Sequence, residues 1–209
     1  MNQNYHKLCL EEISKLTQKK KILLQSCCAP CSSYVITFLS NYFDITVLYY
    51  NPNISPKEEY EKRKKEQIKL IKELKSINEI NFLDCDYDND IYNEKIKGYE
   101  NCKEGGSRCH ICFTLRLEKT AQLAKENNYD FFCSTLTVSP HKNSKIINDI
   151  GFMLEKQYNI KWLPSDFKKN EGFKQSIQLS KQYNLYRQDY CGCIYSYEAR
   201  KKQDLTHTG

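Results

Sequence analysis

The stretch ILLQSCCAPCSSYV, residues 22–35, joins a short apolar run to a group of cysteines. The run at residues 22–24, Ile-Leu-Leu, predicts a buried β-strand. Cys27, Cys28 and Cys31 follow at the point where this strand would turn into a helix. Three thiols at the carboxyl end of a first strand need a chemical explanation, and this is the main question that the sequence raises.

Strand and helix signals alternate along the rest of the chain. Further strands are predicted at residues 45–50, 80–83, 131–135 and 160–163. Helices are predicted around them, at residues 32–40, 57–76, 113–127, 144–158 and 173–183. This order implies βαβ units, and therefore a Rossmann-like α/β fold with a mostly parallel sheet and helices on both faces. Right-handed crossovers would place the loops that follow the strands along one edge of the sheet.

The sequence predicts a single α/β domain over residues 1–209, long enough to bury a core without disulfides. Residues 1–20 have the mixed-charge pattern of an amino-terminal helix, not that of a signal peptide. Residues 197–209 form a basic tail that we expect to be mobile. No stretch is apolar over the length needed to cross a bilayer, so we expect a cytoplasmic protein with no membrane partner.

Cysteine is the residue type that points most directly to function. Eleven cysteines in a reducing compartment indicate metal or redox chemistry rather than a disulfide scaffold. The clustered ones form three groups, which are Cys27, Cys28 and Cys31; Cys109 and Cys112; and Cys191 and Cys193. The isolated ones are expected to be small core residues or incidental, and these are Cys9, Cys85, Cys102 and Cys133.

Two kinds of sulfur chemistry fit the three groups. Adjacent thiols together with a CxxC pair supply four thiolates, which suits either a tetrahedral zinc ion or a [4Fe–4S] cluster. The CxC pair at Cys191 and Cys193 suits a two-electron thiol–disulfide relay or a second metal. Gly192 would relieve the tight backbone of so short a loop. The spacing by itself leaves the choice of metal open.

Positively charged and aromatic side chains recur in the loops beside the sulfur groups. The net charge of +6 has the sign expected for an acidic partner such as a nucleic acid. Aromatic rings would stack on unpaired bases, and cationic or hydroxyl groups would bind phosphates. The candidate substrate-binding residues are Tyr49, Tyr50, Arg63, Ser139, Lys142, Lys168, Lys169 and Arg187. The simpler alternative for each is a helix cap or a surface charge.

Six motifs together resemble one protein family. They are CCAPCSSY, YYNPNI·P·EEY··R, C··CF·LRLE·TA, STLTVSPHKN, DFKK·EG···S and LYRQ·YCGC·YS, and they span residues 27–196. Their order is that expected for epoxyqueuosine reductases of the QueH type. The resemblance implies an iron–sulfur oxidoreductase that removes the epoxide oxygen of epoxyqueuosine at the wobble position of tRNA to leave queuosine. It also implies the HUP-type α/β sandwich of PP-loop enzymes, although the glycine-rich PP-loop sequence is absent after the first strand.

The resemblance also implies roles for the clustered cysteines. The implied ligands of a [4Fe–4S] cluster are Cys27, Cys28, Cys109 and Cys112. Cys191 and Cys193 match the redox-active pair of the family. Cys31 lies near the implied metal site, either as a ligand of a second, mononuclear iron or as a bystander. The implied partners are the anticodon stem-loop of a tRNA that carries epoxyqueuosine and an electron donor that the sequence does not identify.

Removal of an epoxide oxygen as water requires two electrons, two protons and a general acid. Asp166, His141 and Tyr190 are the candidate acids, and the sequence does not choose among them. Two other functions stay open. A zinc-stabilised nucleic-acid-binding module would need no catalysis but would leave the CxC pair unexplained. An ATP-dependent tRNA-modifying enzyme would require a glycine-rich phosphate loop.

Overall fold

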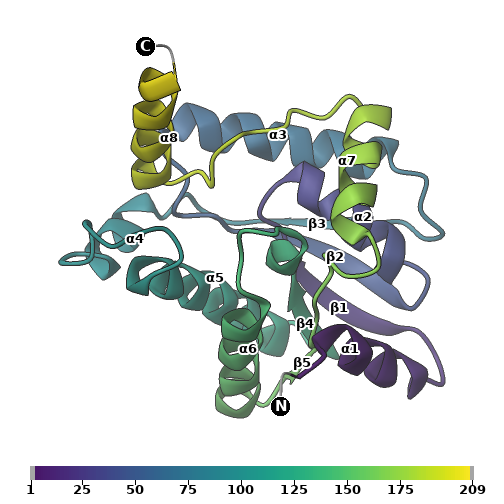
Figure 1. Cartoon of the computed structure of the whole chain (residues 1–209). Helices are drawn as coiled ribbons and strands as arrows, with labels where there is room; N and C mark the ends of the chain where they lie inside the picture. Colours follow the sequence, from purple (N-terminus) through teal and green to yellow (C-terminus); the bar gives the residue numbers. More distant parts are fainter. Residues whose placement is uncertain (1–2, 208–209) are drawn as a thin grey trace.

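Five parallel strands form the centre of the molecule (Figure 1). The structure, a computed structural model, describes residues 3–207, with side chains up to residue 202. Residues 1–2 and 208–209 of the predicted terminal segments therefore lie outside the described residues. The strand order is β3-β2-β1-β4-β5, and every neighbouring pair is parallel. The strands are β1 (Lys20–Gln25), β2 (Phe43–Tyr49), β3 (Asn81–Asp84), β4 (Phe131–Ser134) and β5 (Lys161–Trp162).

Helices cover both faces of the sheet and complete a three-layer arrangement (Figure 1). One face is covered by α2 (Ala29–Leu39), α3 (Lys57–Glu73) and α7 (Gly172–Gln182). The other face is covered by α5 (Ser107–Glu126) and α6 (Ser144–Tyr158), and α1 (Tyr5–Ser14) contacts α6. The remaining elements are α4 (Asn89–Lys95), the 3₁₀ helix η1 (Thr135–Val138) and α8 (Ile194–His207). The predicted α/β fold is therefore confirmed.

The apolar run at residues 22–24 lies at the centre of the core. β1 pairs with β2 on one side and with β4 on the other, and helices cover both faces. Ile22, Leu23 and Leu24 are fully buried as a result. A strand that is buried on both faces has a continuous run of apolar residues instead of alternating apolar and polar ones. The run at residues 22–24 shows this pattern, and it is the basis for the predicted strand. Each predicted strand is present, with its ends shifted by no more than a few residues.

Two helices begin earlier than predicted, and both shifts place cysteines on helical backbone. α2 begins at Ala29 because Pro30 fits the first turn of a helix, where its missing N–H is not needed. α5 begins at Ser107, directly after the turn at Gly105 and Gly106. Gly105 has a φ of +86°, a left-handed conformation that glycine adopts without strain. The sequence predicts the CxxC motif just before this helix. In the structure the motif lies in the first turns of α5.

The carboxyl-terminal segment is helical where the sequence predicts a mobile tail. α8 runs from Ile194 to His207, and Tyr197 packs on Tyr190 with ring centroids 5.2 Å apart. Its sequence is too polar to show a clear amphipathic pattern, so periodicity does not mark it. The mobility of residues 197–209 stays a prediction. Within residues 3–207, no helix has both the length and the apolar character of a membrane span.

Candidate metal and redox site

Several of the predicted functional residues lie near the point where the strand order reverses, between β1 and β4. In open α/β sheets this switch point, at the carboxyl ends of the strands, is where ligands bind. Cys27 follows β1, and Thr135 follows β4. The Cys27 N–H donates to Thr135 Oγ1 at 3.1 Å, and the Thr135 hydroxyl donates to Cys27 Sγ at 3.4 Å. The first thiol is thus tied to both strands of the switch point.

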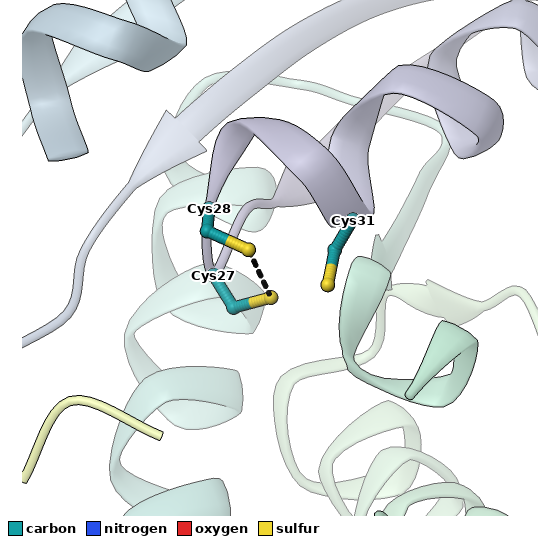
Figure 2. A group of neighbouring side chains, drawn as sticks. All are labelled: Cys27, Cys28 and Cys31. Atoms are coloured by element: carbon teal, nitrogen blue, oxygen red, sulfur yellow. Dashed lines mark hydrogen bonds between the residues drawn. The ribbon is translucent and has the colours of Figure 1, made fainter. Parts of the chain in front are cut away.

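Cys27, Cys28 and Cys31 point toward one another and form a cluster that we call the thiol trio (Figure 2). Their sulfur atoms all lie within 4.8 Å of one another, and those of Cys27 and Cys28 are 3.8 Å apart. α2 creates this geometry, because Cys28 is its N-cap and Cys31 follows three residues later on the same face. A tetrahedral metal with metal–sulfur bonds of about 2.3 Å holds its sulfurs about 3.8 Å apart. The thiol trio could therefore bind a metal ion.

The thiol trio shares negative charge among its sulfurs. Hydrogen bonds from Cys27 and Cys31 hold the pKa of the Cys28 thiol well below its usual range. Hydrogen bonds raise the pKa of Cys31 well above its usual range, because Cys31 is the donor in them, and burial adds to the effect. The amino terminus of α2 further favours a thiolate at Cys28. Such a set suits a cation, since binding replaces thiol protons by one shared positive ion.

Cys109 and Cys112 lie on one face at the start of α5, because residues three apart in a helix are neighbours. The Gly105 N–H donates to Cys109 Sγ at 3.2 Å. Burial raises the pKa of Cys112 to about 12. Cys112 also packs with Cys193 in a small buried cluster that includes Tyr92 of α4. The start of α5 therefore meets the start of α8, which brings the second and third sulfur groups together.

The loop at residues 191–193 is held through its backbone. The Ser55 N–H donates to the Gly192 carbonyl at 3.0 Å, and Arg63 Nη1 donates to the Cys191 carbonyl at 3.3 Å. Gly192 has a φ of +119°, and a Cβ there would lie 3.0 Å from Arg63 Nη1. The conformation and the close approach of Arg63 both favour glycine. Both cysteines of the loop are free thiols.

Lys142 contacts the sulfur of Cys191. Its Nζ donates to Cys191 Sγ at 3.2 Å and to Glu104 Oε1 at 3.3 Å, and its side chain is 10% exposed. Burial lowers the pKa of the Lys142 ammonium, but the Cys191 sulfur and the Glu104 carboxylate outweigh burial, so the pKa is raised. The ammonium therefore stays charged beside the thiol. A phosphate contact, as predicted for Lys142, would require the side chain to leave Cys191.

Arg116 is a buried residue of the site that the sequence patterns above do not single out. It lies on α5 one turn after Cys112, and it is 2% exposed. Its Nε donates to the Cys112 carbonyl at 3.3 Å, and its Nη1 donates to Asn51 Oδ1 at 3.5 Å. Its electrostatic neighbours are Cys112, Cys191 and Cys27. The signal that could have revealed it is an arginine on the same helix face as the CxxC cysteines.

A cavity of about 500 Å³ opens beside the sulfur groups. Its volume lies in the range of small-molecule sites, about 300–1,000 Å³. Its lining includes Arg116 and the thiol-bearing residues Cys27, Cys28, Cys31 and Cys191. Of the predicted substrate-binding and acid residues, the lining includes Ser139, His141, Lys142, Arg187 and Tyr190. The first and third sulfur groups therefore open into one cavity.

Three predicted substrate-binding residues are buried and do not line the cavity. Tyr49 and Tyr50 belong to the core, so neither ring has an open face for a base. β2 is covered on both sides of the sheet, which is the physical reason for their burial. Arg63 is 1% exposed, and its Nε is paired with Glu59 Oε1 at 2.6 Å. In this structure Arg63 holds the loop at residues 191–193.

Asp166, Lys168 and Lys169 also lie outside the cavity lining. Asp166 is buried, and its Oδ1 is paired with Lys168 Nζ at 2.7 Å. Lys168 Nζ also donates to the Lys142 carbonyl at 3.4 Å, so this pair supports the segment that carries Lys142. Lys169 is exposed. Two of the three candidate acids reach the cavity, and Asp166 is the one that does not.

Fold and site together define a class of protein. The sheet is all-parallel and Rossmann-like, and thiols from separate segments meet beside a cavity at its switch point. The thiol trio stands after β1, where nucleotide-binding relatives of this fold carry a glycine-rich phosphate loop. The molecule is therefore a Rossmann-like α/β protein with a sulfur-based site.

Comparison with known proteins identifies the family. Residues 22–199 match the family described as Epoxyqueuosine reductase QueH, and the chain belongs to this family. It is 44% identical over 199 residues to Epoxyqueuosine reductase QueH of Streptococcus pyogenes serotype M1, over 92% of this chain and 78% of that protein. The same-named protein of Staphylococcus epidermidis is 42% identical over 92% of this chain and 84% of its own length. Epoxyqueuosine reductase QueH of Thermotoga maritima is 33% identical over 87% of this chain and 93% of its own length. The predicted family is confirmed.

Proposed function

We propose that this chain reduces the epoxide of epoxyqueuosine at the wobble position of tRNA, which yields queuosine. The family to which it belongs is named for such a reductase. The observation that carries the proposal is that the thiol trio and Cys191 open into one cavity of about 500 Å³. A metal-binding thiol set and a redox thiol can then act on one substrate. The proposed location is the cytoplasm, where thiols stay reduced.

The redox pair matches the electron count of the reaction. The epoxide takes up two electrons and two protons, loses its oxygen as water and becomes an alkene. Oxidation of the Cys191 and Cys193 thiols to a disulfide releases two electrons and two protons. An external electron donor then returns the pair to the dithiol form.

We infer that the metal group is a [4Fe–4S] cluster whose ligands are Cys27, Cys28, Cys109 and Cys112. The donor set fits this group, because thiolates are the usual ligands of iron–sulfur clusters and these thiols lie at the starts of α2 and α5. A bound cluster would supply electrons one at a time at low potential. The chain contributes the amino termini of α2 and α5 beside these thiols, and helix amino termini stabilise a negatively charged group bound there.

The position of Arg116 supports a centre shared by the two cysteine pairs. Cys27 and Cys112 belong to different segments, yet both are electrostatic neighbours of its guanidinium. Cys109 and Cys112 do not line the cavity, so this common neighbour is the observation that supports a centre shared with Cys27 and Cys28. Cys31 lies within 4.8 Å of the sulfurs of Cys27 and Cys28, so we include it in the metal site, as a ligand of the same group or of a second, mononuclear iron.

The substrate base is proposed to enter the cavity beside Cys191. A wobble nucleotide belongs to a single-stranded loop and can be turned out of its stack into a pocket. Arg187 lines the cavity and is exposed, and Ser139 also lines it, so both suit contacts with the tRNA backbone. His141 and Tyr190 reach the cavity, and we propose that one of them protonates the departing oxygen.

Lys142 is proposed to act on Cys191 rather than on a phosphate. The Lys142 ammonium donates to Cys191 Sγ at 3.2 Å, so it would stabilise negative charge that develops on this sulfur as it reacts. Glu104 Oε1 lies 3.3 Å from the same ammonium and holds it in place. Lys142 is therefore a positioning residue for the redox pair.

Anaerobic purification followed by iron, sulfide and zinc analysis tests the metal assignment. About four irons per chain, or slightly more, would support the cluster. A protein that holds only zinc after iron–sulfur reconstitution would support the zinc-stabilised nucleic-acid-binding module instead. Activity is tested by incubating loaded enzyme and a reductant with tRNA that carries epoxyqueuosine and measuring queuosine. Iron-loaded protein that binds this tRNA but forms no queuosine would overturn the proposed reaction.

A further inference from the structure

One buried charge in the site lacks a counter-ion. Arg116 is 2% exposed, and its hydrogen bonds go to neutral acceptors, the Cys112 carbonyl and Asn51 Oδ1. Among the described side chains, residues 3–202, no carboxylate forms an ion pair with it. Its Nη2 is buried and has no hydrogen-bond partner within the same residues. A buried guanidinium without a negative partner is strongly unfavourable.

Arg63 shows how the chain balances such a charge elsewhere. It is 1% exposed, but Glu59 Oε1 accepts from its Nε at 2.6 Å. Its Nη2 also has no partner among the described residues, yet the carboxylate neutralises the charge. Arg63 does not line the cavity, whereas Arg116 does. Of these two arginines, the one that faces the cavity is the one whose charge is unbalanced.

The groups around Arg116 include three thiols, the Tyr92 hydroxyl and the Lys142 ammonium. Burial lowers the pKa of its guanidinium, but Cys112, Cys191 and Cys27 outweigh burial when they are anionic, so the pKa is raised. Cys27 and Cys112 belong to the proposed ligand set, and Cys191 belongs to the redox pair. Three of the groups that act on the guanidinium are therefore cysteines of the proposed site, and a negatively charged group held by their sulfurs would supply the missing counter-charge.

A buried polar network fixes the direction of the guanidinium. Asn51 Oδ1 accepts from Arg116 Nη1 at 3.5 Å and from Gln25 Nε2 at 3.2 Å. Asn51 Nδ2 donates to the Ser26 carbonyl at 2.8 Å, and Gln25 Oε1 accepts from Ser134 Oγ at 2.8 Å. These partners lie at the ends of β1, β2 and β4, so the switch point itself orients Arg116. Two of its nitrogens are held by the protein, and Nη2 is left for a ligand.

We propose that Arg116 is the counter-charge of the sulfur–metal centre and that its Nη2 donates a hydrogen bond to a sulfur of that centre. The inference rests on the proposed function, because the charge it requires is that of thiolate-bound iron. Such a centre becomes more negative when it gains an electron. A fixed positive charge beside it stabilises the reduced state most and raises its reduction potential. Arg116 thus sets the potential at which the centre delivers electrons.

The test compares Arg116→Met with the wild-type chain in metal-loaded and metal-free forms. Met keeps an unbranched apolar side chain and removes the charge. In the metal-free form we expect the melting temperature to be unchanged or higher, because an unbalanced buried charge is removed. In the loaded form we expect it to fall by about 2–4 °C. The reduction potential of the loaded variant should become more negative, and a chelator should remove its iron faster.

Two further variants serve as controls. Arg63→Met removes a buried arginine that has a carboxylate partner, so it should lower the melting temperature of both forms by leaving Glu59 unpaired. Arg116→Lys keeps the charge but loses the planar donor group. The reduction potential of Arg116→Lys should be closer to the wild-type value than that of Arg116→Met. A chelator should still remove iron from Arg116→Lys faster than from the wild type.

Equal losses of melting temperature in both forms of Arg116→Met, with an unchanged potential, would overturn the inference, because a packing residue behaves in that way. If Arg116→Met does not fold, the rate at which a chelator removes iron from Arg116→Lys tests the inference. Faster loss of iron supports the hydrogen bond from Nη2, and an unchanged rate of loss overturns it. A wild-type protein that binds no iron would instead overturn the proposed metal group, so the two failures are distinguishable.

Discussion

The thiol trio and the loop at residues 191–193 both belong to the sulfur site, but the chain builds them in different ways. The thiol trio is local, because one strand end and the first turn of α2 bring its sulfurs within 4.8 Å of one another. The loop is assembled from distant parts, since Ser55 and Arg63 hold its backbone and Lys142 reaches its sulfur. A local site keeps its shape as long as one helix start does, whereas an assembled site depends on the packing of the whole chain.

The charges around the two regions also differ. In the thiol trio, the sulfurs hydrogen-bond to one another, which lowers the pKa of Cys28 and raises that of Cys31. At the loop, Cys191 faces the ammonium of Lys142 instead. Sulfurs that share one charge suit a metal site, and a sulfur beside a fixed cation suits electron and proton exchange. This difference supports the proposed division, in which the thiol trio binds the metal and the loop exchanges electrons and protons.

The largest effect is expected for Cys27→Ser, which should remove both bound iron and turnover. Mutation of a residue that only supports a metal ligand lowers metal affinity by about 10–100-fold, and loss of a ligand itself should lower it further. Iron per chain after anaerobic purification is the measurement. Iron at the wild-type level in a Cys27→Ser, Cys109→Ser double variant would reject the ligand assignment.

Cys191→Ser should abolish queuosine formation but keep most of the iron, because this sulfur is assigned to the redox pair and not to the metal. Iron content and product formation are measured on the same preparation. If the variant loses iron as completely as Cys27→Ser, the loop is part of the metal site, and the proposed difference in role between the thiol trio and the loop is wrong.

Lys142→Met should slow the reaction by about 100-fold with unchanged iron, because Cys191 loses the cation that stabilises negative charge on its sulfur as it reacts. Lys142→Arg keeps the charge and should retain more activity. Single-turnover rates and tRNA affinity separate the two possible roles. A Met variant that reacts at the wild-type rate but binds tRNA more weakly would make Lys142 a phosphate-binding residue, as the sequence predicts.

Gly192→Ala should have a moderate effect, since it places a side chain at a φ of +119° and 3.0 Å from Arg63 Nη1. We expect a loss of about 1–3 kcal/mol in the free energy of unfolding and slower turnover, with iron retained. Urea unfolding under anaerobic conditions measures the first quantity. Wild-type stability would show that the loop is not held against Arg63 as the structure has it.

The smallest effect is expected for Cys85→Ser, which changes an isolated, half-buried cysteine outside both regions. Iron content and turnover should match the wild type, and the free energy of unfolding should change by no more than about 0.5–1 kcal/mol. Loss of iron in this variant would extend the metal site beyond the three cysteine groups.

Local sequence patterns predict the parallel sheet, the family and the sulfur groups, but not α4, α8 or the starts of α2 and α5. The apolar run at residues 22–24 and the alternation of strand and helix signals predicted a parallel sheet, because burial on both faces leaves a direct trace in composition. The spacing of the cysteines is equally local. The predicted helix begins at residue 32, whereas α2 begins at Ala29, and this earlier start is what places Cys28 and Cys31 one helical turn apart.

Which side chains face the cavity depends on tertiary packing. Tyr49 and Tyr50 are core residues because both faces of β2 are covered, and Arg63 and Lys142 are engaged by partners distant in sequence. The only local signal of Arg116 is its place on the helix face of the CxxC cysteines, and its burial cannot be predicted from that, since a charged residue on a helix is usually solvated. Local patterns specify backbone elements, but the environment of a long polar side chain depends on which distant segments pack against it.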